Sequence, residues 1–128
     1  MKILLVDDSA IIRRVLKNSL AEILSEVEFV EANDGVEALQ ALKDNSDIEI
    51  MFLDVNMPNM KGDVCLAEMR QNSDYNKVKV IMATTEAEKN MVIKMMKLGA
   101  NGYLVKPFNP DAIKNSLRPI VARMGIDI

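Results

Sequence analysis

Residues 3–9 of the chain read ILLVDDS, and this stretch decides the fold that the sequence predicts. Its first four residues are aliphatic without interruption, which is typical of a strand buried on both faces of a sheet. Two aspartates follow at once, and Ser9 is well suited to cap a helix that runs to about Leu24. The apolar stripe of that helix comprises Ile12, Val15, Leu16 and Leu20. The stretch therefore predicts a buried strand, a polar turn and a helix in immediate succession.

The same strand-and-helix unit recurs along the rest of the chain. Further short apolar runs lie at residues 28–32, 50–53, 78–83 and 103–105. The segments after them have helical character at about residues 34–44, 63–71, 88–98 and from 110 onward. Strands and helices that alternate at this spacing predict right-handed crossovers and a parallel sheet that helices cover on both faces.

Three of the predicted helices carry recognisable end signals. Asp34 is an N-cap residue, and Glu37 three positions later completes a capping box. Gly99 is favourable just after the fourth helix, and Asn109 caps a last helix that has proline at its first position. Pro119 lies inside that last helix, where its missing N–H is expected to kink or end the helix.

The composition limits the class of protein. The 128 residues predict one domain, and a content of 49% hydrophobic and 27% charged residues is typical of a globular protein. A net charge of −3 argues against nucleic acid or an anionic membrane as the main partner. No apolar stretch approaches the ~20 residues of a membrane span, and the N-terminus lacks the pattern of a signal peptide. We therefore expect no membrane insertion and a cytoplasmic location.

The counts of cysteine and histidine exclude several chemistries. Cys65 is the only cysteine, so the chain has no intramolecular disulfide and no cysteine-rich zinc site. We expect Cys65 to be an inert packing residue on the third helix. The chain has no histidine, which removes histidine-based general base catalysis, histidine metal ligation and histidine phosphorylation within it.

Polar residues follow the predicted strands where they end, and those after four of the five strands could carry chemistry. In chain order they are Asp7 and Asp8, Asp54 and Asn56, Thr84 and Thr85, and Lys106. Because ligands of such sheets bind beyond the carboxyl ends of the strands, we expect these side chains to converge at one edge. Three carboxylates so close together would raise one another's pKa unless a cation lay among them.

The residue types at this edge favour phosphoryl chemistry assisted by a metal ion. The available metal ligands are oxygens, which favours Mg²⁺ over zinc. A lysine and hydroxyl groups beside a divalent ion form a site for an anion, and a carboxylate can itself be the nucleophile that forms an acyl phosphate. Taken singly, Asp8 could be a helix cap, Asp54 a strand end, Thr84 a turn residue and Lys106 a solvated lysine. Their combination favours a functional site.

Four segments of the chain together resemble one known family. They are LLVDDS at residues 4–9, DVNMPNMKG at 54–62, MATTE at 82–86 and GANGYLVKPF at 99–108. Through these segments the chain resembles the receiver domain of two-component response regulators over its whole length. Within that family it is most similar to the stand-alone receivers that act in chemotaxis. The resemblance implies a flavodoxin-like α/β fold, a doubly wound five-stranded parallel sheet of order 2-1-3-4-5 with five helices. It also implies a single receiver domain over residues 1–128 with no output domain.

The resemblance further implies the roles of the residues at the carboxyl edge. Asp54 would be the phosphorylated nucleophile. Mg²⁺ would be held by Asp8, Asp54 and the carbonyl of Asn56, with Asp7 acting largely through a metal-bound water. Lys106 would pair with the phosphoryl oxygens, and the peptide bond after it would be cis. Such a protein catalyses only its own phosphorylation and dephosphorylation and is not otherwise an enzyme.

Switching and turnover are implied for four residues. Thr84 would bond the phosphoryl group in the active state, and Tyr103 would be the aromatic rotamer switch. Asn56 and Glu86 would flank the path of the water that attacks the phosphoryl group, and both are polar, which predicts a phosphoryl group that lasts seconds to minutes rather than hours.

The implied partners are two proteins. The phosphodonor would be a phosphohistidine on a histidine kinase. A downstream protein would bind the face made by the fourth helix, the fifth strand and the fifth helix, where Val92, Met96 and Tyr103 are expected to be exposed. The chain itself is expected to be a monomer.

Three alternative functions would place different demands on the sequence. A phosphatase of the haloacid dehalogenase type would need a second aspartate two residues after the nucleophile on the first strand, whereas Asn56 follows Asp54 on the third. A flavodoxin-like flavin binder would need a phosphate-binding loop after the first strand, where Asp7 and Asp8 would repel a phosphate. A degenerate receiver acting only as a scaffold would not need the complete set of acids, hydroxyl and lysine.

Overall fold

The computed structural model describes the backbone of residues 1–128 and every side chain except those of Glu86 and Ala87. Within this part of the chain, five strands form one sheet in the order β2-β1-β3-β4-β5, and every neighbouring pair is parallel. The strands are β1 (Lys2–Val6), β2 (Glu28–Ala32), β3 (Ile48–Asp54), β4 (Lys79–Thr84) and β5 (Gly102–Val105). The predicted fold class and strand order are therefore confirmed.

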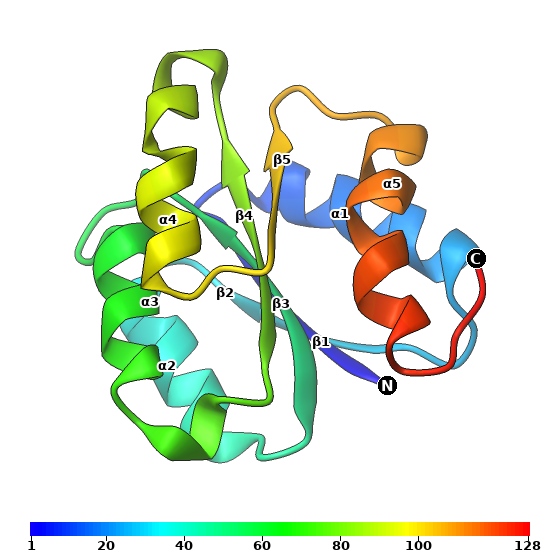
Figure 1. The fold of residues 1–128 in the computed structure, drawn as a ribbon, viewed down its shortest axis with the longest axis horizontal. Helices are drawn as coiled ribbons and strands as arrows, with labels where there is room; N and C mark the ends of the chain where they lie inside the picture. Colours follow the sequence, from blue (N-terminus) through cyan, green and yellow to red (C-terminus); the bar gives the residue numbers. More distant parts are fainter.

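Helices cover both faces of the sheet. They are α1 (Ala10–Ile23), α2 (Gly35–Asp44), α3 (Gly62–Arg70), α4 (Val92–Leu98) and α5 (Pro110–Ala122), with short 3₁₀ helices η1 (Ser73–Tyr75) and η2 (Glu86–Met91). Figure 1 shows α1 and α5 on one face of the sheet and α2, α3 and α4 on the other. No helix in the described part of the chain is both long and apolar enough to cross a membrane.

Each strand contributes side chains to two separate layers of the core, because successive residues of a strand point to opposite faces. Leu4, Met51 and Met82 lie in the layer under α2, α3 and α4, whereas their neighbours Ile3 and Phe52 lie in the layer under α1 and α5. This double burial explains why the strands read as continuous apolar runs. Cys65 on α3 is fully buried in the first layer, and burial raises the pKa of its thiol to about 12, so its interpretation as a packing residue is confirmed.

One predicted helix start and one predicted capping box differ from the structure. The fourth helix was expected from Glu88, but residues Glu86–Met91 form η2 and the α-helix begins only at Val92. A 3₁₀ turn ahead of an α-helix closes i→i+3 bonds, here from the Glu88 N–H to the Thr85 carbonyl at 3.0 Å. At α2, Asp34 caps as predicted, but the Glu37 carboxylate accepts from the N–H of Asn33 at 3.1 Å, one residue before the cap.

Two expectations about helix faces also need correction. Val15 was placed on the buried stripe of α1, yet it is exposed, because the stripe that meets the sheet is centred on Leu16 and Leu20. Pro119 does not end α5, which continues to Ala122. Pro119 is on the exposed side of the helix, and the buried side chains of Ile120 and Val121 hold the last turn against the core.

Candidate functional site

Asp7 and Asp8 follow β1, and the start of α1 fixes the first of them. The Oδ1 atom of Asp7 accepts a hydrogen bond from the backbone N–H of Ser9 at 2.9 Å, and Ser9 in turn caps α1 by accepting from the N–H of Ile12. The Nη1 atom of Arg13 donates to the backbone carbonyl of Asp7 at 2.6 Å. Asp7 is therefore buried and held in place, whereas Asp8 is exposed and is not the helix cap.

Asp54 is the last residue of β3 and is only 4% exposed. After Asp54 the backbone still runs beside β4, because the N–H of Val55 donates to the carbonyl of Ala83 at 3.1 Å. Gly62 then returns to this point, and its N–H bonds the Val55 carbonyl at 2.9 Å. A Cβ atom at Gly62 would collide with the carbonyl oxygen of Asp54, so the position requires glycine. The start of α3 thus packs directly against the backbone of Asp54.

Lys106 joins the two buried carboxylates from the far end of the chain. Its Nζ atom lies 2.8 Å from Oδ2 of Asp7 and 3.1 Å from Oδ1 of Asp54. One carboxylate oxygen from each of Asp7, Asp8 and Asp54 lies within 4.8 Å of the others. The peptide bond between Lys106 and Pro107 is cis. The structure therefore brings together the three acids and the lysine that the sequence placed at this edge.

The buried charges change the acidity of the site. Burial raises the pKa of Asp54 to about 6, and the negative charge of Asp7 acts in the same direction, against the opposing effects of Lys106 and of a hydrogen bond from the backbone of Asn56. Burial alone would lower the pKa of Lys106, but its hydrogen bonds and charge interactions with Asp7 and Asp54 raise it. Asp54 is therefore harder to ionise than an ordinary aspartate, and Lys106 is held as a cation.

The donor set fits a hard divalent cation. Three carboxylates share one lysine charge, so the cluster retains excess negative charge, and its ligand atoms are oxygens only. Oxygen donors of this kind suit Mg²⁺, which keeps several waters and binds through one or two carboxylates.

Thr84 ends β4 beside this cluster and is completely buried. Among the described side chains its Oγ1 atom has no hydrogen-bond partner. A buried hydroxyl without a partner is costly, and an incoming acceptor oxygen would relieve that cost. Tyr103 on β5 is 46% exposed, and it pairs in register with Met82, two residues before Thr84 on the neighbouring strand. Thr84 and Tyr103 are therefore on the same face of the sheet.

Of the two residues expected along the water path, one has a described side chain and the other does not. Asn56 is exposed two residues after Asp54, and its backbone N–H bonds the Asp54 carboxylate. The side chain of Glu86 lies outside the described residues.

Supporting contacts of the site were missed at the level of sequence. Besides holding Asp7, Arg13 donates to Oδ1 of Asn33 and to Glu31, both at 2.9 Å. Asn59, in the loop after β3 with a φ of 65°, donates to Oδ2 of Asp34 at 2.6 Å. These contacts join residues 18 to 25 positions apart, so no local pattern could have revealed them.

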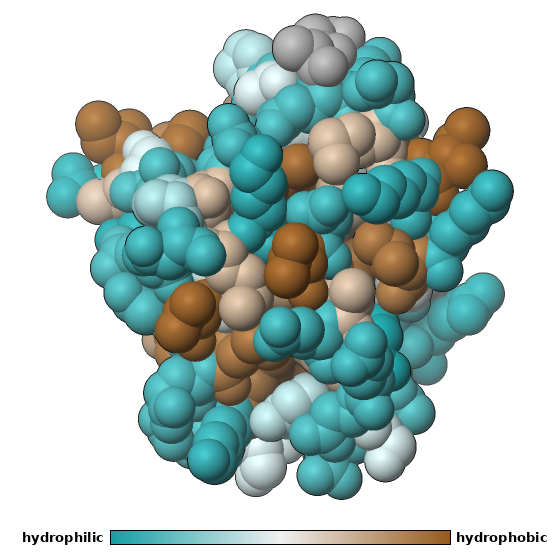
Figure 2. All heavy atoms as spheres, turned by 90° about the vertical axis from the view of Figure 1, so that its left-hand side faces the viewer, coloured by the Kyte–Doolittle hydropathy of each residue, from teal (hydrophilic) through white to brown (hydrophobic). Residues whose placement is uncertain are grey.

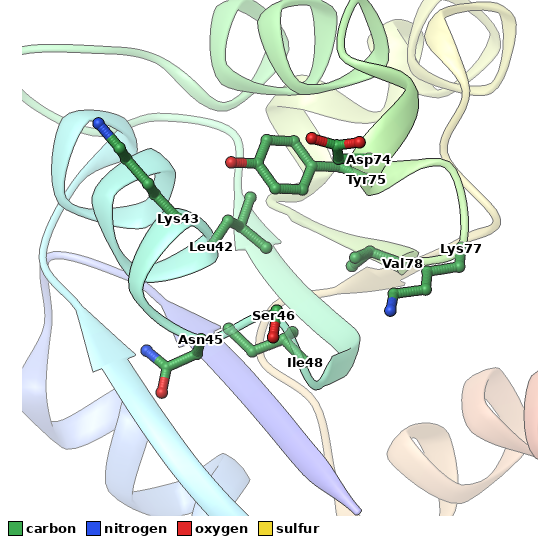
Figure 3. Close-up of a pocket in the computed structure, with 9 residues that line it drawn as sticks. All are labelled: Leu42, Lys43, Asn45, Ser46, Ile48, Asp74, Tyr75, Lys77 and Val78. Carbon is green, nitrogen blue, oxygen red and sulfur yellow. The ribbon is translucent and has the colours of Figure 1, made fainter.

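A hollow of about 380 Å³ lies at the opposite edge of the sheet, between the end of α2 and the start of β4. Figure 3 shows its apolar floor of Leu42, Ile48 and Val78, with the amino groups of Lys43 and Lys77 pointing away from each other. The polar groups that it shows do not converge on a common point. The chemistry of the molecule is therefore concentrated at the carboxyl edge.

Comparison with known proteins agrees with this geometry. The profile of the response regulator receiver domain matches residues 3–118, and the chain belongs to this family. Among curated proteins, it is 40% identical to the chemotaxis protein CheY1 of Helicobacter pylori strain 26695 over 121 residues, 94% of this chain and 97% of the relative. It is 39% identical to the chemotaxis protein CheY-3 of Vibrio cholerae over 124 residues, 97% of this chain and 94% of the relative.

A solved structure gives the same result for the fold. The chemotaxis response regulator CheY4 of Vibrio cholerae superposes with a TM-score of 0.83 and 34% sequence identity, over 93% of this chain and 97% of that one. The chain is therefore a receiver domain of the two-component type, similar to chemotaxis regulators over nearly its whole length. Family membership excludes the haloacid dehalogenase and flavodoxin alternatives and leaves the scaffold alternative to experiment.

Proposed function

We propose that this protein is a phosphorylation-activated response regulator of chemotaxis that accepts a phosphoryl group on Asp54 from the phosphohistidine of a histidine kinase. One observation carries the proposal: the ammonium group of Lys106 lies 2.8 Å from Asp7 and 3.1 Å from Asp54 at an edge where three carboxylates meet. A structural lysine would need only one carboxylate partner. A cation held beside buried acids is placed to pair with the oxygens of a transferred phosphoryl group.

The proposed transfer needs Asp54 in its ionised form. A carboxylate oxygen of Asp54 attacks the phosphorus atom, an O–P bond forms, the P–N bond of the phosphohistidine breaks, and the leaving imidazole takes up a proton. Lys106, already bound to Oδ1 of Asp54, is placed to move its hydrogen bond to a phosphoryl oxygen. Attack by water on the phosphorus later breaks the O–P bond, releases inorganic phosphate and restores Asp54. We propose that Asn56 and Glu86 flank the path of that water.

Mg²⁺ is the cation that we propose for the acid cluster. Its ligands would be Asp8, Asp54 and the backbone carbonyl of Asn56, with Asp7 bound through a water. When bound, Mg²⁺ supplies positive charge that offsets the repulsion between the carboxylates and the phosphoryl oxygens.

Asp54 is buried, so a partner has little direct access to a phosphoryl group on it. Signalling would therefore proceed through a change in the conformation of the protein surface. We propose that the Thr84 hydroxyl, which has no partner among the described side chains, moves to bond the phosphoryl group and that Tyr103 turns inward. The partner would bind the face of α4, β5 and α5, where Ile93, Met96 and Tyr103 are exposed. Val92, expected on this face, is half-buried. The protein is proposed to act as a monomer.

Incubation with acetyl phosphate and Mg²⁺ followed by intact mass measurement tests the proposal. We expect one phosphoryl adduct in the wild type, none after Asp54→Asn, and none in the wild type when Mg²⁺ is chelated. The exposed Asp127, far from the cluster, provides the matched control Asp127→Asn, which should be modified like the wild type. Absence of an adduct with both acetyl phosphate and a phosphorylated kinase would support the scaffold alternative instead.

A further inference from the structure

Among the described side chains, two polar contacts tie α4 to α3, and they lie at opposite ends of α4. Near its start, Nζ of Lys94 lies 3.1 Å from Oδ2 of Asp63, in the first turn of α3. At its end, Nε of Arg70 in the last turn of α3 donates to the carbonyl of Gly99 at 3.1 Å. The surface that α2, α3 and α4 share is mixed, with separate apolar side chains among hydrophilic ones (Figure 2). The Lys94 side chain is more than half exposed, so water competes with its ion pair.

The two ties differ greatly in strength. Arg70 also donates to the carbonyls of Tyr75 and Val78 and to Oδ1 of Asn101, at 2.8, 2.7 and 3.2 Å, so it is fixed by four acceptors. The side chain of Lys94 is 58% exposed, and its ammonium group contacts one carboxylate oxygen, Oδ2 of Asp63. The end of α4 is thus anchored by a partly buried network of hydrogen bonds, whereas the polar tie at its beginning is one surface ion pair beside the apolar packing of Met95.

The weak tie lies next to the glycine that packs against the backbone of the proposed phosphoacceptor. Asp63 follows Gly62, which packs against the carbonyl of Asp54 so closely that no Cβ fits between them. A shift of the backbone after Asp54 would press on Gly62 and so reach Asp63 beside it. The other carboxylate oxygen of Asp63, Oδ1, is buried and has no hydrogen-bond partner among the described residues, so Asp63 depends on Lys94 for its pairing.

We propose that the Asp63–Lys94 ion pair is a latch that holds the start of α4 in its resting position and opposes the phosphorylated state. The pair is formed at 3.1 Å in the unphosphorylated protein, so displacement of α3 relative to α4 lengthens it and weakens it. The cost then falls on the state in which the helices have moved. This inference rests on the proposed function and adds a residue pair that regulates the same site.

Linkage gives the latch a measurable signature at the phosphoryl site. If the pair favours the resting state, then Lys94→Met and Asp63→Asn should each tighten the binding of beryllofluoride, a stable phosphoryl mimic, in the presence of Mg²⁺. The expected gain is about two- to fivefold, the range for an exposed ion pair. Simple electrostatic attraction predicts otherwise: loss of the Lys94 cation would weaken binding of an anion, and only Asp63→Asn would strengthen it.

Titration of ¹⁵N-labelled protein with beryllofluoride measures the affinity residue by residue. The double variant should bind no tighter than the tighter single variant, because one interaction has been removed twice. Lys97→Met, at an exposed lysine on the same helix, is the matched control and should not tighten binding. Tightening by Asp63→Asn alone would reveal a local role at the start of α3 and would overturn the latch.

Hydrogen–deuterium exchange of the unphosphorylated protein gives a second readout, which does not involve binding of an anion. Both single variants should speed exchange in the first turn of α4, at residues 92–95, and leave the amides near Arg70 unchanged. Unchanged exchange and unchanged affinity in both variants would refute the latch while the proposed function stands. A wild type that binds no beryllofluoride with Mg²⁺ would instead refute the proposed function, and the latch with it.

Discussion

Replacing Asp54 by asparagine should stabilise the metal-free protein at neutral pH, although it removes the proposed phosphoacceptor. The carboxyl of Asp54 has a pKa of about 6 in the folded protein, against an ordinary value of 3.8. The folded state therefore binds an additional proton between about pH 4 and pH 6, and stability falls as the pH rises through that range. Above about pH 6 the folded state carries the full penalty of a buried carboxylate beside Asp7.

The size of the effect follows from the same comparison. The difference between about 6 and 3.8 corresponds to about 3 kcal/mol at roughly 1.4 kcal/mol per pH unit. An asparagine side chain is uncharged, and its oxygen can still accept from Lys106, which keeps its second partner Asp7 at 2.8 Å. We therefore expect Asp54→Asn to raise the free energy of unfolding by about 2 to 3 kcal/mol at pH 7.5.

Urea unfolding with a metal chelator, at several values between pH 4 and pH 8, measures this difference. The two proteins should be almost equally stable near pH 4 and should diverge as the pH rises, with the wild type falling below the variant. Asp127→Asn should show no such divergence, because that carboxylate is exposed. A variant that is equally stable or less stable at pH 7.5 would show that burial does not disfavour the Asp54 carboxylate, and the account of the site electrostatics would fail.

Three further substitutions give distinct outcomes. Lys106→Met should lower the free energy of unfolding by about 3 kcal/mol in a chelator, since two buried carboxylates lose their cation, and Mg²⁺ should restore much of it in the same urea assay. Thr84→Ala should change stability by less than about 1 kcal/mol, because the hydroxyl has no partner among the described residues, yet it should reduce the gain in partner affinity on phosphorylation. Gly62→Ala should lower the free energy of unfolding by about 3 kcal/mol or more, measured by thermal unfolding, because its Cβ would collide with the Asp54 carbonyl. Gly125→Ala is the control and should cost less. Its Cβ would meet no atom within 4 Å, and only the φ of 81° adds strain.

The strand pattern was predictable because the physics behind it is local. A strand buried on both faces must be apolar throughout, so the runs at β1, β3 and β4 are visible without any knowledge of their neighbours. The start of β3 was missed by two residues because its second residue, Glu49, is exposed and interrupts the apolar run. The acids at the carboxyl edge could be found for a similar reason, since parallel strands place their ends together.

The contacts that complete the site could not be predicted in this way. Arg13 reaches Asn33 and Lys94 reaches Asp63 only because particular turns of separate elements face each other. The sequence also could not distinguish the 3₁₀ turn of η2 from the first turn of an α-helix, since both place residues three apart on one side. The exposed Val15 shows the same limit, because four apolar residues on α1 do not say which of them meets the sheet.

The bridge from Lys106 to Asp7 closes a loop of 99 residues between the first strand and the last. The paired acids and their cation therefore come together only in a molecule whose sheet is complete from β1 to β5. In an unfinished or partly unfolded chain, Asp54 would be an ordinary solvated aspartate with no lysine beside it. The competence to receive a phosphoryl group would thus itself be a test of correct folding, and a damaged molecule could not draw phosphoryl groups away from intact ones.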